Sequence, residues 1–362
     1  MAYTDIDKPS DYFNTVLYTG DGNSTKSISG VGFQLDWNWT KSRSATYNHI
    51  VMDSVRGFGT GKKLSPNVST EEGSSSNVED GGGFITSTSS DGYALGTTDV
   101  SNNVHFNKSG ATYVSWNWKA GTSFTNDASA TGIGSIDSTG SVNTDAGFSI
   151  VSYTGGTDPE TFAHGLGVVP TMIIVKDRST SGGWRIYHQA IGNGKVLAWG
   201  SGEYGGTIAA TNSDAWNATT PTSSVVTVGN DTITNGNGTT HIAYCFADVK
   251  GYSKIGSYTG NGSTNGSFIY TGFKPAFFLI KNTNDGTDDW HIMDNKRNGY
   301  NPQNNILQPN LNDAEGSSTR VDFLSNGVKI NSSSAFINGS GETIIYMAFA
   351  ENPFVTSTGV PA

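Results

Sequence analysis

The sequence predicts an all-β protein made of three tandem, homologous antiparallel β-sandwich modules of a jelly-roll-like kind. Charged residues make up only 14% of the 362 residues, which disfavours helices because Glu, Lys and Arg are among the residues that propagate them. Thr, Val, Ile and aromatic residues are instead interrupted by Gly and Asn throughout the chain. This composition is typical of short strands joined by tight turns.

An internal repeat is the observation that divides the chain. Six sequence blocks recur three times in the same order and at nearly the same separation, each copy opening with Tyr-Thr-Gly and closing with a Gly before an apolar run. A repeat of this length is too long for a solenoid and suits a series of related domains. The opening motifs stand at 18–22, 153–157 and 258–262, and the closing motifs at 110–118, 238–246 and 341–349.

These motifs give the expected domain organisation. Units 2 and 3 are nearly contiguous in sequence, so we expect them to pack against each other. Residues 123–145 are polar and are expected to form either a linker or an ordered surface excursion. The expected segments are an N-terminal arm (1–10), unit 1 (11–122), the polar segment (123–145), unit 2 (146–251), unit 3 (253–354) and a C-terminal tail (355–362).

Within each unit the hydrophobic pattern has the period of a strand. The stretch FQLDWNWT (33–40) alternates apolar and polar residues, which predicts a strand with one buried face. Its counterparts TMIIVK (171–176) and AFFLIK (276–281) are apolar on both faces, as central strands are. Asp91-Gly92 and Asn326-Gly327 favour two-residue hairpins. Two packed antiparallel sheets per unit are therefore expected, with closure into a barrel as the alternative.

One loop is written twice in the chain. LSPNVSTEEGSSS (64–76) and LQPNLNDAEGSST (307–319) align without a gap, while unit 2 has no counterpart. The paired carboxylates Glu71 with Glu72 and Asp313 with Glu315 could flank a glycosidic bond. The alternative is a solvated loop whose carboxylate accepts a hydrogen bond from a turn amide. Because unit 2 lacks the pattern, copying of the unit explains the loop and catalysis is not required.

Other features of the sequence point away from an enzyme. No motif for a hydrolase, a nucleotide-binding loop or a metal cluster is present, so we expect no catalytic residues, no metal and no cofactor. Asp285, Asp288 and Asp289 could contribute to a calcium site, but they do not have the spacing of an EF-hand. Cys245, the only cysteine, lies in an apolar run and is expected to be a buried hydrophobic residue.

The net charge and the hydropathy exclude two classes of partner. A formal net charge of −10 argues against a nucleic-acid partner, which would need clustered Lys and Arg. No apolar run is long enough for membrane insertion. The best candidate for a binding surface is a set of aromatic residues separated by Gly, Ser and Asn in unit 2, namely Trp199, Tyr204 and Trp216. They are expected to bind a glycan or a partner protein, or alternatively to fill the protein's own core.

Several motifs resemble those of a known group of proteins. YTGNGST, MDSVRG, LSPNVSTEEGSSS, SSDGYALG and ATYVSWNWKAG are similar to the repeat modules of virion structural proteins, commonly labelled tail-fibre-like, of marine tailed phages that infect cyanobacteria and pelagic bacteria. The resemblance implies a non-enzymatic tail fibre or tail-associated appendage, assembled in the host cytoplasm and incorporated into the virion. It implies other virion proteins as partners, a homo-oligomer such as a trimer, and a host-surface glycan as a candidate ligand. The alternatives are a capsid decoration protein and, third, a glycan-binding or glycan-cleaving tailspike.

Overall fold

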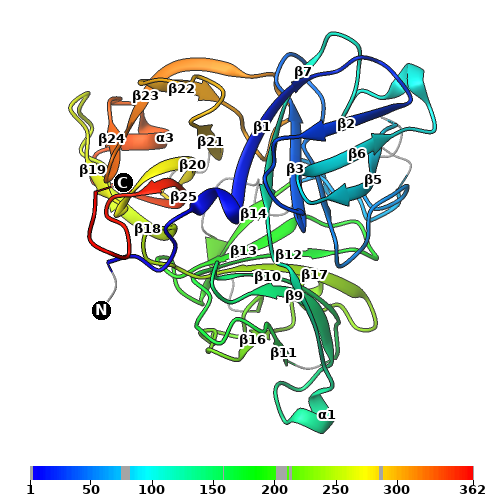
Figure 1. Ribbon diagram of the computed structural model, residues 1–362. Helices are drawn as coiled ribbons and strands as arrows, with labels where there is room; N and C mark the ends of the chain where they lie inside the picture. Colours follow the sequence, from blue (N-terminus) through cyan, green and yellow to red (C-terminus); the bar gives the residue numbers. More distant parts are fainter. Residues whose placement is uncertain are drawn as a thin grey trace.

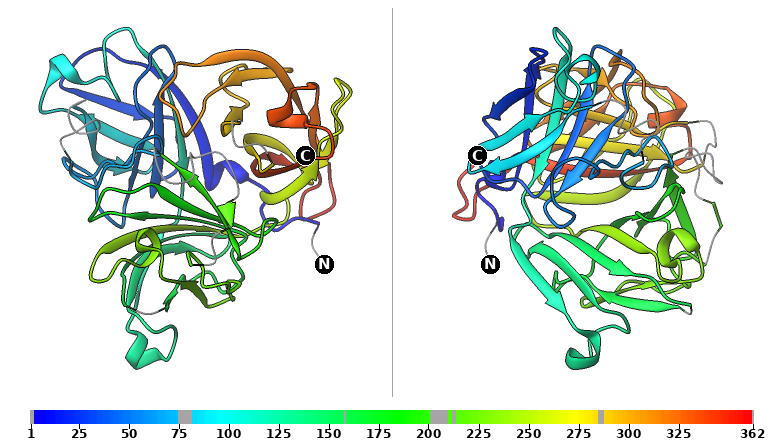
Figure 2. Two further views of the ribbon diagram at one scale, coloured as in Figure 1. Left: turned by 180° about the vertical axis from the view of Figure 1, so that it is seen from behind. Right: turned by 90° about the vertical axis from the view of Figure 1, so that its right-hand side faces the viewer.

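The computed structural model describes residues 3–74, 82–157, 159–200, 210–211, 214–284 and 288–361. Three β-rich lobes surround a common centre, with unit 1 in blue and cyan, unit 2 in green, and unit 3 in yellow to red (Figure 1). The three lobes are also distinct from behind, whereas in the side view units 1 and 3 overlap and unit 2 lies apart from them (Figure 2). Each α-helix in the described part of the chain has only four residues, and none could cross a membrane. The predicted all-β class with antiparallel sheets is confirmed.

Each unit contributes four strands in the same spatial order, and all neighbouring strands are antiparallel. We call these three groups of strands the inner sheets. They are β1 (Phe13–Thr19), β7 (Thr112–Trp118), β3 (Trp37–Ser42) and β4 (Ile50–Asp53) in unit 1; β10 (Phe148–Thr154), β17 (Thr240–Phe246), β12 (Met172–Asp177) and β13 (Trp184–His188) in unit 2; and β18 (Ser253–Thr259), β25 (Thr343–Pro353), β20 (Phe273–Asn282) and β21 (His291–Asp294) in unit 3.

The pairing register makes positions in the three units comparable. Trp118 of β7 pairs with Trp37 of β3, and Trp37 pairs with Asp53 of β4. In unit 2 the corresponding residues are Phe246, Met172 and His188. In unit 3 they are Phe349, Phe277 and Asp294. We call residues that occupy the same register position equivalent.

The inner sheet of unit 2 has more strands than the other two. Residues 123–145 are ordered, because most of them belong to β8 (Thr122–Asn126), α1 (Ala128–Thr131) and β9 (Ser138–Asn143). Strand β9 pairs with β10 and β8 pairs with β9, and α1 projects from this lobe (Figure 2). On the opposite edge, β14 (Lys195–Trp199) and β15 (Ala210–Thr211) complete eight strands.

A second, outer sheet covers one face of each inner sheet. Separate apolar clusters lie between the two layers, such as Met52 with Leu95 in unit 1, Val175 with Val226 in unit 2 and Ile280 with Val328 in unit 3. The short helices η1 (Pro9–Asp11), η3 (Val100–Asn102), α2 (Thr232–Asn235) and α3 (Ala335–Asn338) lie outside the sheets. The outer sheets are β2 (Thr25–Ser29), β6 (Gly92–Gly96) and β5 (Phe84–Ser89); β11 (Glu160–Ala163) and β16 (Val225–Val228); and β19 (Phe268–Tyr270), β24 (Gly327–Ile330), β23 (Gly316–Leu324) and β22 (Gln303–Ile306).

The other faces of the three inner sheets meet in one shared core. The ring centroids of Trp37 in unit 1 and Tyr244 in unit 2 are 4.6 Å apart. Phe246 of unit 2 lies 6.1 Å from Phe349 of unit 3, and Phe349 lies 5.3 Å from Phe13 of unit 1. Each unit therefore contacts both of the others, whereas the sequence had suggested a contact between units 2 and 3 and nothing about the other two pairs.

The predicted strand at 33–40 needs correction. Strand β3 begins only at Trp37, and all six of its residues are buried. The polar side chains on its second face are covered by the outer sheet and bond to each other. Asn38 Nδ2 donates to Ser115 Oγ at 2.9 Å and to Asn117 Oδ1 at 2.8 Å. The alternation therefore marks a buried polar layer rather than a solvent-exposed face, and bonding within that layer offsets its desolvation.

Both predicted hairpins form, with their turns one residue earlier than expected. Ser89 pairs with Gly92, and Leu324 pairs with Gly327, so each glycine is the first residue of its returning strand. A Cβ at Gly92 would lie 1.9 Å from the carbonyl oxygen of Ile28, and a Cβ at Gly327 would lie 2.1 Å from that of Ile269. Close approach of a third strand therefore requires glycine at both positions.

Candidate functional site

Equivalent residues join the three units in a ring of polar contacts. Asp53 of unit 1 accepts a hydrogen bond from the Tyr244 hydroxyl of unit 2 at 2.7 Å. Asp294 of unit 3 accepts one from Trp116 Nε1 of unit 1 at 3.0 Å. The equivalent residue in unit 2, His188, places Nε2 3.4 Å from the carbonyl oxygen of Tyr346 in unit 3. Each unit thus uses the last residue of the same strand to contact the next unit.

The two aspartates of this ring also form buried ion pairs. Asp53 Oδ2 lies 2.6 Å from Arg56 Nε, and Asp294 Oδ2 lies 2.5 Å from Arg297 Nε, with all four side chains inaccessible to solvent. Burial alone would lower the pKa of Arg56, but the charges of Asp53, Tyr244 and Glu72 outweigh it and raise the pKa. These charged groups are therefore held paired inside the protein rather than presented to a substrate.

The duplicated loops make further contacts between neighbouring units of this ring. We call residues 64–73 and 307–316 the clasp loops. In the first, Glu72 contacts Arg178 Nε of unit 2 and lies 3.0 Å from Lys62 Nζ. In the second, Glu315 accepts from Arg43 Nε and Nη2 of unit 1 at 2.9 and 2.8 Å. Arg43 and Arg178 occupy equivalent positions, so both loops make the same contact to the following unit.

Backbone contacts and pKa shifts strengthen the equivalence of the two loops. The amide of Glu72 donates to the carbonyl of Arg178 at 3.0 Å, and that of Glu315 donates to the carbonyl of Arg43 at 2.8 Å. Hydrogen bonding to Glu315 raises the pKa of Arg43. Burial would raise the pKa of Glu72, but the Arg178 and Arg56 guanidinium groups outweigh it and lower the pKa. Both carboxylates are therefore engaged in contacts between units.

The interface between units 2 and 3 lacks this arginine. Thr283 occupies the position equivalent to Arg43 and Arg178, as the register of β20 shows. The part of unit 2 where a third clasp loop would fall includes residues 201–209 and 212–213, which lie outside the described residues. Gln189 Nε2 of unit 2 instead donates to the carbonyl of Ile255 in unit 3 at 3.0 Å.

The carboxylates that the sequence offered for catalysis or calcium have other roles. Glu71 accepts from Ser181 Oγ of unit 2 at 2.5 Å. Hydrogen bonds from Ser181, from its own backbone amide and from Ser74 lower the pKa of Glu71, so it bonds to its own turn as well as to another unit. Asp289 accepts from Asn310 Nδ2 at 2.6 Å and Gln308 Nε2 at 3.0 Å and so anchors the second clasp loop. Asp285 lies outside the described residues. Within the described ranges, no three His, Cys, Asp or Glu side chains gather as metal ligands would.

The aromatic residues that the sequence suggested as a binding surface lie in the interior. Trp199 and Trp216 are each only 1% exposed. Trp199 belongs to the shared core, 5.3 Å from Trp39 and 5.5 Å from Trp290 between ring centroids, and Trp216 packs on Tyr187 inside unit 2. Tyr204 lies outside the described residues. For both tryptophans the structure shows the alternative of core packing, so neither ring can stack on a glycan.

Buried lysines and the single cysteine are similarly enclosed. Lys41, Lys176 and Lys281 are equivalent and fully buried, and each Nζ donates to the carbonyl of the next residue. Burial lowers the pKa of Lys41 to about 7 and that of Lys176 to about 8. Cys245 is completely buried, as predicted, and burial raises the pKa of its thiol to about 12. No substrate can reach these four side chains in the folded protein.

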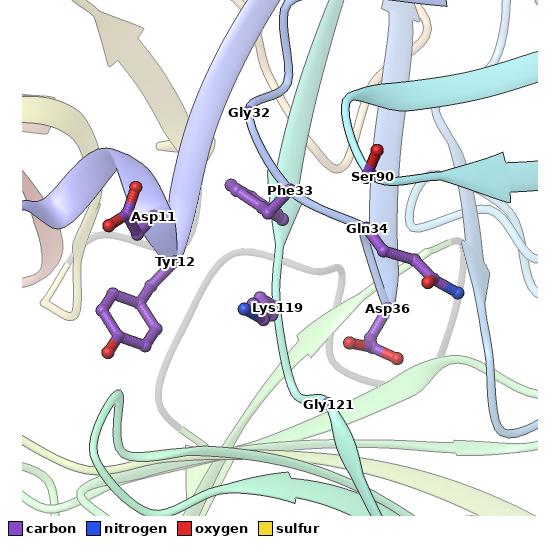
Figure 3. Close-up of a pocket in the computed structure, with 9 residues that line it drawn as sticks. All are labelled: Asp11, Tyr12, Gly32, Phe33, Gln34, Asp36, Ser90, Lys119 and Gly121. Atoms are coloured by element: carbon purple, nitrogen blue, oxygen red, sulfur yellow. The ribbon is translucent and has the colours of Figure 1, made fainter.

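Two pockets lie at matching ends of inner sheets and are candidate binding sites. The first, in unit 1, has a volume of about 580 Å³ and opens where β3 begins and β7 ends. Figure 3 shows Lys119 between Tyr12 on one side and Asp36 on the other. Asp36 is already bonded, because it accepts from Ser54 Oγ at 2.7 Å and from the amide of Ala120 at 2.9 Å. Burial raises the pKa of Asp36 despite these bonds.

The second pocket lies at the same end of the unit 3 inner sheet, where β20 begins and β25 ends. Its volume is about 450 Å³. Its wall is richer in amide groups than that of the first pocket, and it includes an exposed tyrosine. The polar and aromatic side chains that line it are those of Lys274, Asn295, Lys296, Tyr300, Asn301, Gln303, Phe323 and Glu351.

Comparison with known proteins supports one assignment. The family described as "Domain of unknown function (DUF7483)" matches residues 8–353. The chain belongs to this DUF7483 family. The match spans all three units, the shared core and both pockets, so the family is defined by the whole ring of units and not by one of them. No curated protein and no solved structure matches the chain.

Sequence reasoning missed the residues that connect the units, although a signal for some of them was present. Arg43, Arg178 and the three buried lysines stand at fixed distances from the repeat motifs, and aligning the three copies would have paired them. The pocket in unit 3 gave no such signal. Gln303 lies in an Asn-rich stretch of unit 3 whose side chains are polar and unpatterned.

Proposed function

We propose that this DUF7483 protein is a non-enzymatic virion structural protein, in the first place a tail fibre or tail-associated appendage. The observation that carries the non-enzymatic part is the fate of Glu72 and Glu315. These carboxylates had the best sequence pattern for catalysis, and each is bound by the guanidinium of another unit. The resemblance of the repeat motifs to marine tailed-phage proteins supports the virion part.

We also propose that the three units are copies of one jelly-roll-like sandwich. The common strand order of the inner sheets supports this. The equivalent contacts of the two clasp loops support it further, because a loop copied with its unit would reach the same position on the next unit. Solved structures of single units from relatives would test whether the strand order is retained.

Assembly with other virion proteins, and self-association into an oligomer such as a trimer, belong to the same proposal. Light scattering on the purified chain after size-exclusion chromatography measures its oligomeric state. We expect a mass corresponding to a trimer. A monomeric mass at all concentrations would contradict self-association and leave docking to other virion proteins as the mode of assembly.

Location on the particle is tested by immunogold labelling of intact phages that encode this chain. We expect gold on the tail, together with peptides of the chain in purified virions by mass spectrometry. Gold on the head would instead support the alternative of a capsid decoration protein. Absence of the chain from purified virions would contradict the proposal as a whole.

A further inference from the structure

We propose that the pocket of about 450 Å³ in unit 3 binds a saccharide through Asn295, Tyr300 and Gln303. The pocket combines buried hydrogen-bond acceptors that meet no donor among the described residues, a charged pair at its rim and an exposed aromatic ring. Saccharides suit this combination because their hydroxyl groups donate and accept hydrogen bonds while their C–H faces pack on aromatic rings. No such role follows from the family assignment.

Gln303 is the central acceptor of the pocket. Its side chain is held in one orientation, because Nε2 faces two oxygens, the carbonyl of Tyr300 at 3.2 Å and Asn301 Oδ1 at 3.5 Å. Oε1 must therefore point the other way. Gln303 is only 4% exposed, and no donor among the described residues reaches Oε1. Leaving a buried amide oxygen without a donor is unfavourable, and a ligand hydroxyl would supply the missing donor.

Asn295 supplies a second acceptor of the same kind. Its backbone is fixed by a hydrogen bond from its amide to the carbonyl of Ala276 at 3.0 Å. Its Oδ1 is buried, and no donor within the described part of the chain bonds to it. At the rim, Lys274 Nζ lies 2.9 Å from Glu351 Oε2. Two acceptors and a cation that line the same pocket suit a ligand with several hydroxyl groups, which can donate to the amides and accept from the ammonium group.

Tyr300 provides the apolar surface. Its side chain lines the pocket, and the residue is 73% exposed, the largest exposure of any large hydrophobic residue described. An exposed aromatic ring offers a flat apolar face on which the C–H face of a sugar can pack. Because its backbone carbonyl also accepts from Gln303 and from Asn298 Nδ2, the ring is attached to a fixed point beside the amide acceptors.

The pocket in unit 1 serves as an internal comparison. It is larger and has a comparable position in its unit, and it also contains a tyrosine, a lysine and a carboxylate. None of the side chains that line it contains a buried polar atom without a partner, as far as the described residues show. Asp36 is satisfied by Ser54 and Ala120, and Gln34 Nε2 donates to Thr88 Oγ1 at 3.2 Å. Unmet acceptors thus distinguish the unit 3 pocket.

Saturation-transfer NMR on the full chain tests the site. The probes are D-glucose, D-galactose, D-mannose, L-rhamnose, N-acetyl-D-glucosamine and D-glucuronate, which separate neutral from acidic sugars. We expect at least one of them to bind with a Kd of about 1 mM, as is usual for so few contacts. Tyr300→Ala and Asn295→Ala should each weaken that binding at least tenfold.

Two control variants and one stability measurement make the outcome specific. Tyr270→Ala removes an exposed tyrosine of unit 3 outside the pocket, and Gln34→Ala alters the unit 1 pocket; both should bind the sugar as the unaltered chain does. Tm should be unchanged in Tyr300→Ala and unchanged or higher in Asn295→Ala, since the latter removes an unsatisfied acceptor. Failure of every probe to bind, or full binding by both pocket variants, would overturn the proposal.

The saccharide site rests on the proposed function in one respect only, namely that the source of the saccharide would be a host surface. Binding by the isolated chain does not depend on where the protein sits in a virion. A saccharide-binding chain that is absent from virions would therefore keep the site and remove the proposed function. A virion protein that binds none of the probes would do the opposite.

Discussion

Glu315 of unit 3 binds Arg43 of unit 1 through both carboxylate oxygens, at 2.9 Å to Nε and 2.8 Å to Nη2. The same carboxylate lies 3.1 Å from Arg297 Nη1 of its own unit. One anion therefore joins a cation of unit 1 to a cation of unit 3, across 272 residues of sequence. Glu72 joins units 1 and 2 in the corresponding way.

Neutralising this anion should destabilise the protein. In Glu315→Gln, two arginines lose their shared carboxylate while remaining partly or fully buried. Removing one partner of a buried ion pair typically costs 3–5 kcal/mol, and we expect about 3 kcal/mol because Arg43 is partly solvated. Urea denaturation measures the change in the free energy of unfolding. Asp11→Asn, which breaks the exposed pair with Lys8, is the control and should have no measurable effect; equal effects of the two variants would refute the role of Glu315.

The shared core should make the three units unfold together. Trp37 contacts Trp118 of its own unit at 4.5 Å and Tyr244 of unit 2 at 4.6 Å between ring centroids. Trp37→Ala should cost about 4 kcal/mol, as large-to-small changes in a core do. Differential scanning calorimetry should show one transition that moves as a whole to lower temperature. Separate transitions, of which only one moved, would contradict a common core. Tyr3→Ala, at an exposed position, should leave Tm unchanged.

The buried histidines should make the protein sensitive to mild acid. Burial lowers the pKa of His188 to about 4 and that of His105 and His291 to about 3, while an unfolded histidine titrates near 6.5. As the pH falls from 7 to 5 the unfolded chain binds protons that the folded chain does not, so stability should fall with pH. Carboxylates titrate mainly below this window.

Thermal unfolding between pH 7 and pH 5 measures this dependence. We expect Tm to decrease steadily over that range in the unaltered protein. His188→Gln removes one of the titrating groups while keeping a side chain that can bond to Tyr346, so its Tm should depend less steeply on pH. A Tm that is constant down to pH 5 would show that the histidines are accessible or charged in the folded state.

Two glycines should be intolerant of a methyl group. Gly327→Ala places Cβ 2.1 Å from the Ile269 carbonyl, and Gly92→Ala places it 1.9 Å from the Ile28 carbonyl. Each change forces an outer-sheet strand to shift, at a cost of about 1–3 kcal/mol. Chemical denaturation measures the loss. Gly194→Ala, where a Cβ would meet no atom within 4 Å, is the matched control, and a similar loss there would assign the effect to glycine content in general.

The strands and their repetition could be predicted from the sequence, because both depend on short stretches of neighbouring residues. Period-two alternation located β3, and continuous apolar runs located its counterparts, but neither pattern could show that Asn38 faces a second sheet rather than water. The sequence also could not distinguish Trp199 in a core from a tryptophan on a surface, since Gly-rich flanks occur in both settings. The Arg43–Glu315 contact has no local signal, because it depends on how the ring of units closes. Gln303 was missed because its unsatisfied oxygen is a property of three-dimensional packing.

The shared core has a consequence for how the sequence of such a protein can evolve. In an assembly of three identical chains, any substitution appears three times, and an altered loop must suit all three environments. Here the threefold arrangement is encoded in one continuous chain, so each lobe can vary while the other two stay as they are. The missing arginine at Thr283 and the amide-lined pocket beside Gln303 are two such differences. A single gene thereby combines trimer-like architecture with three independently adjustable outer surfaces.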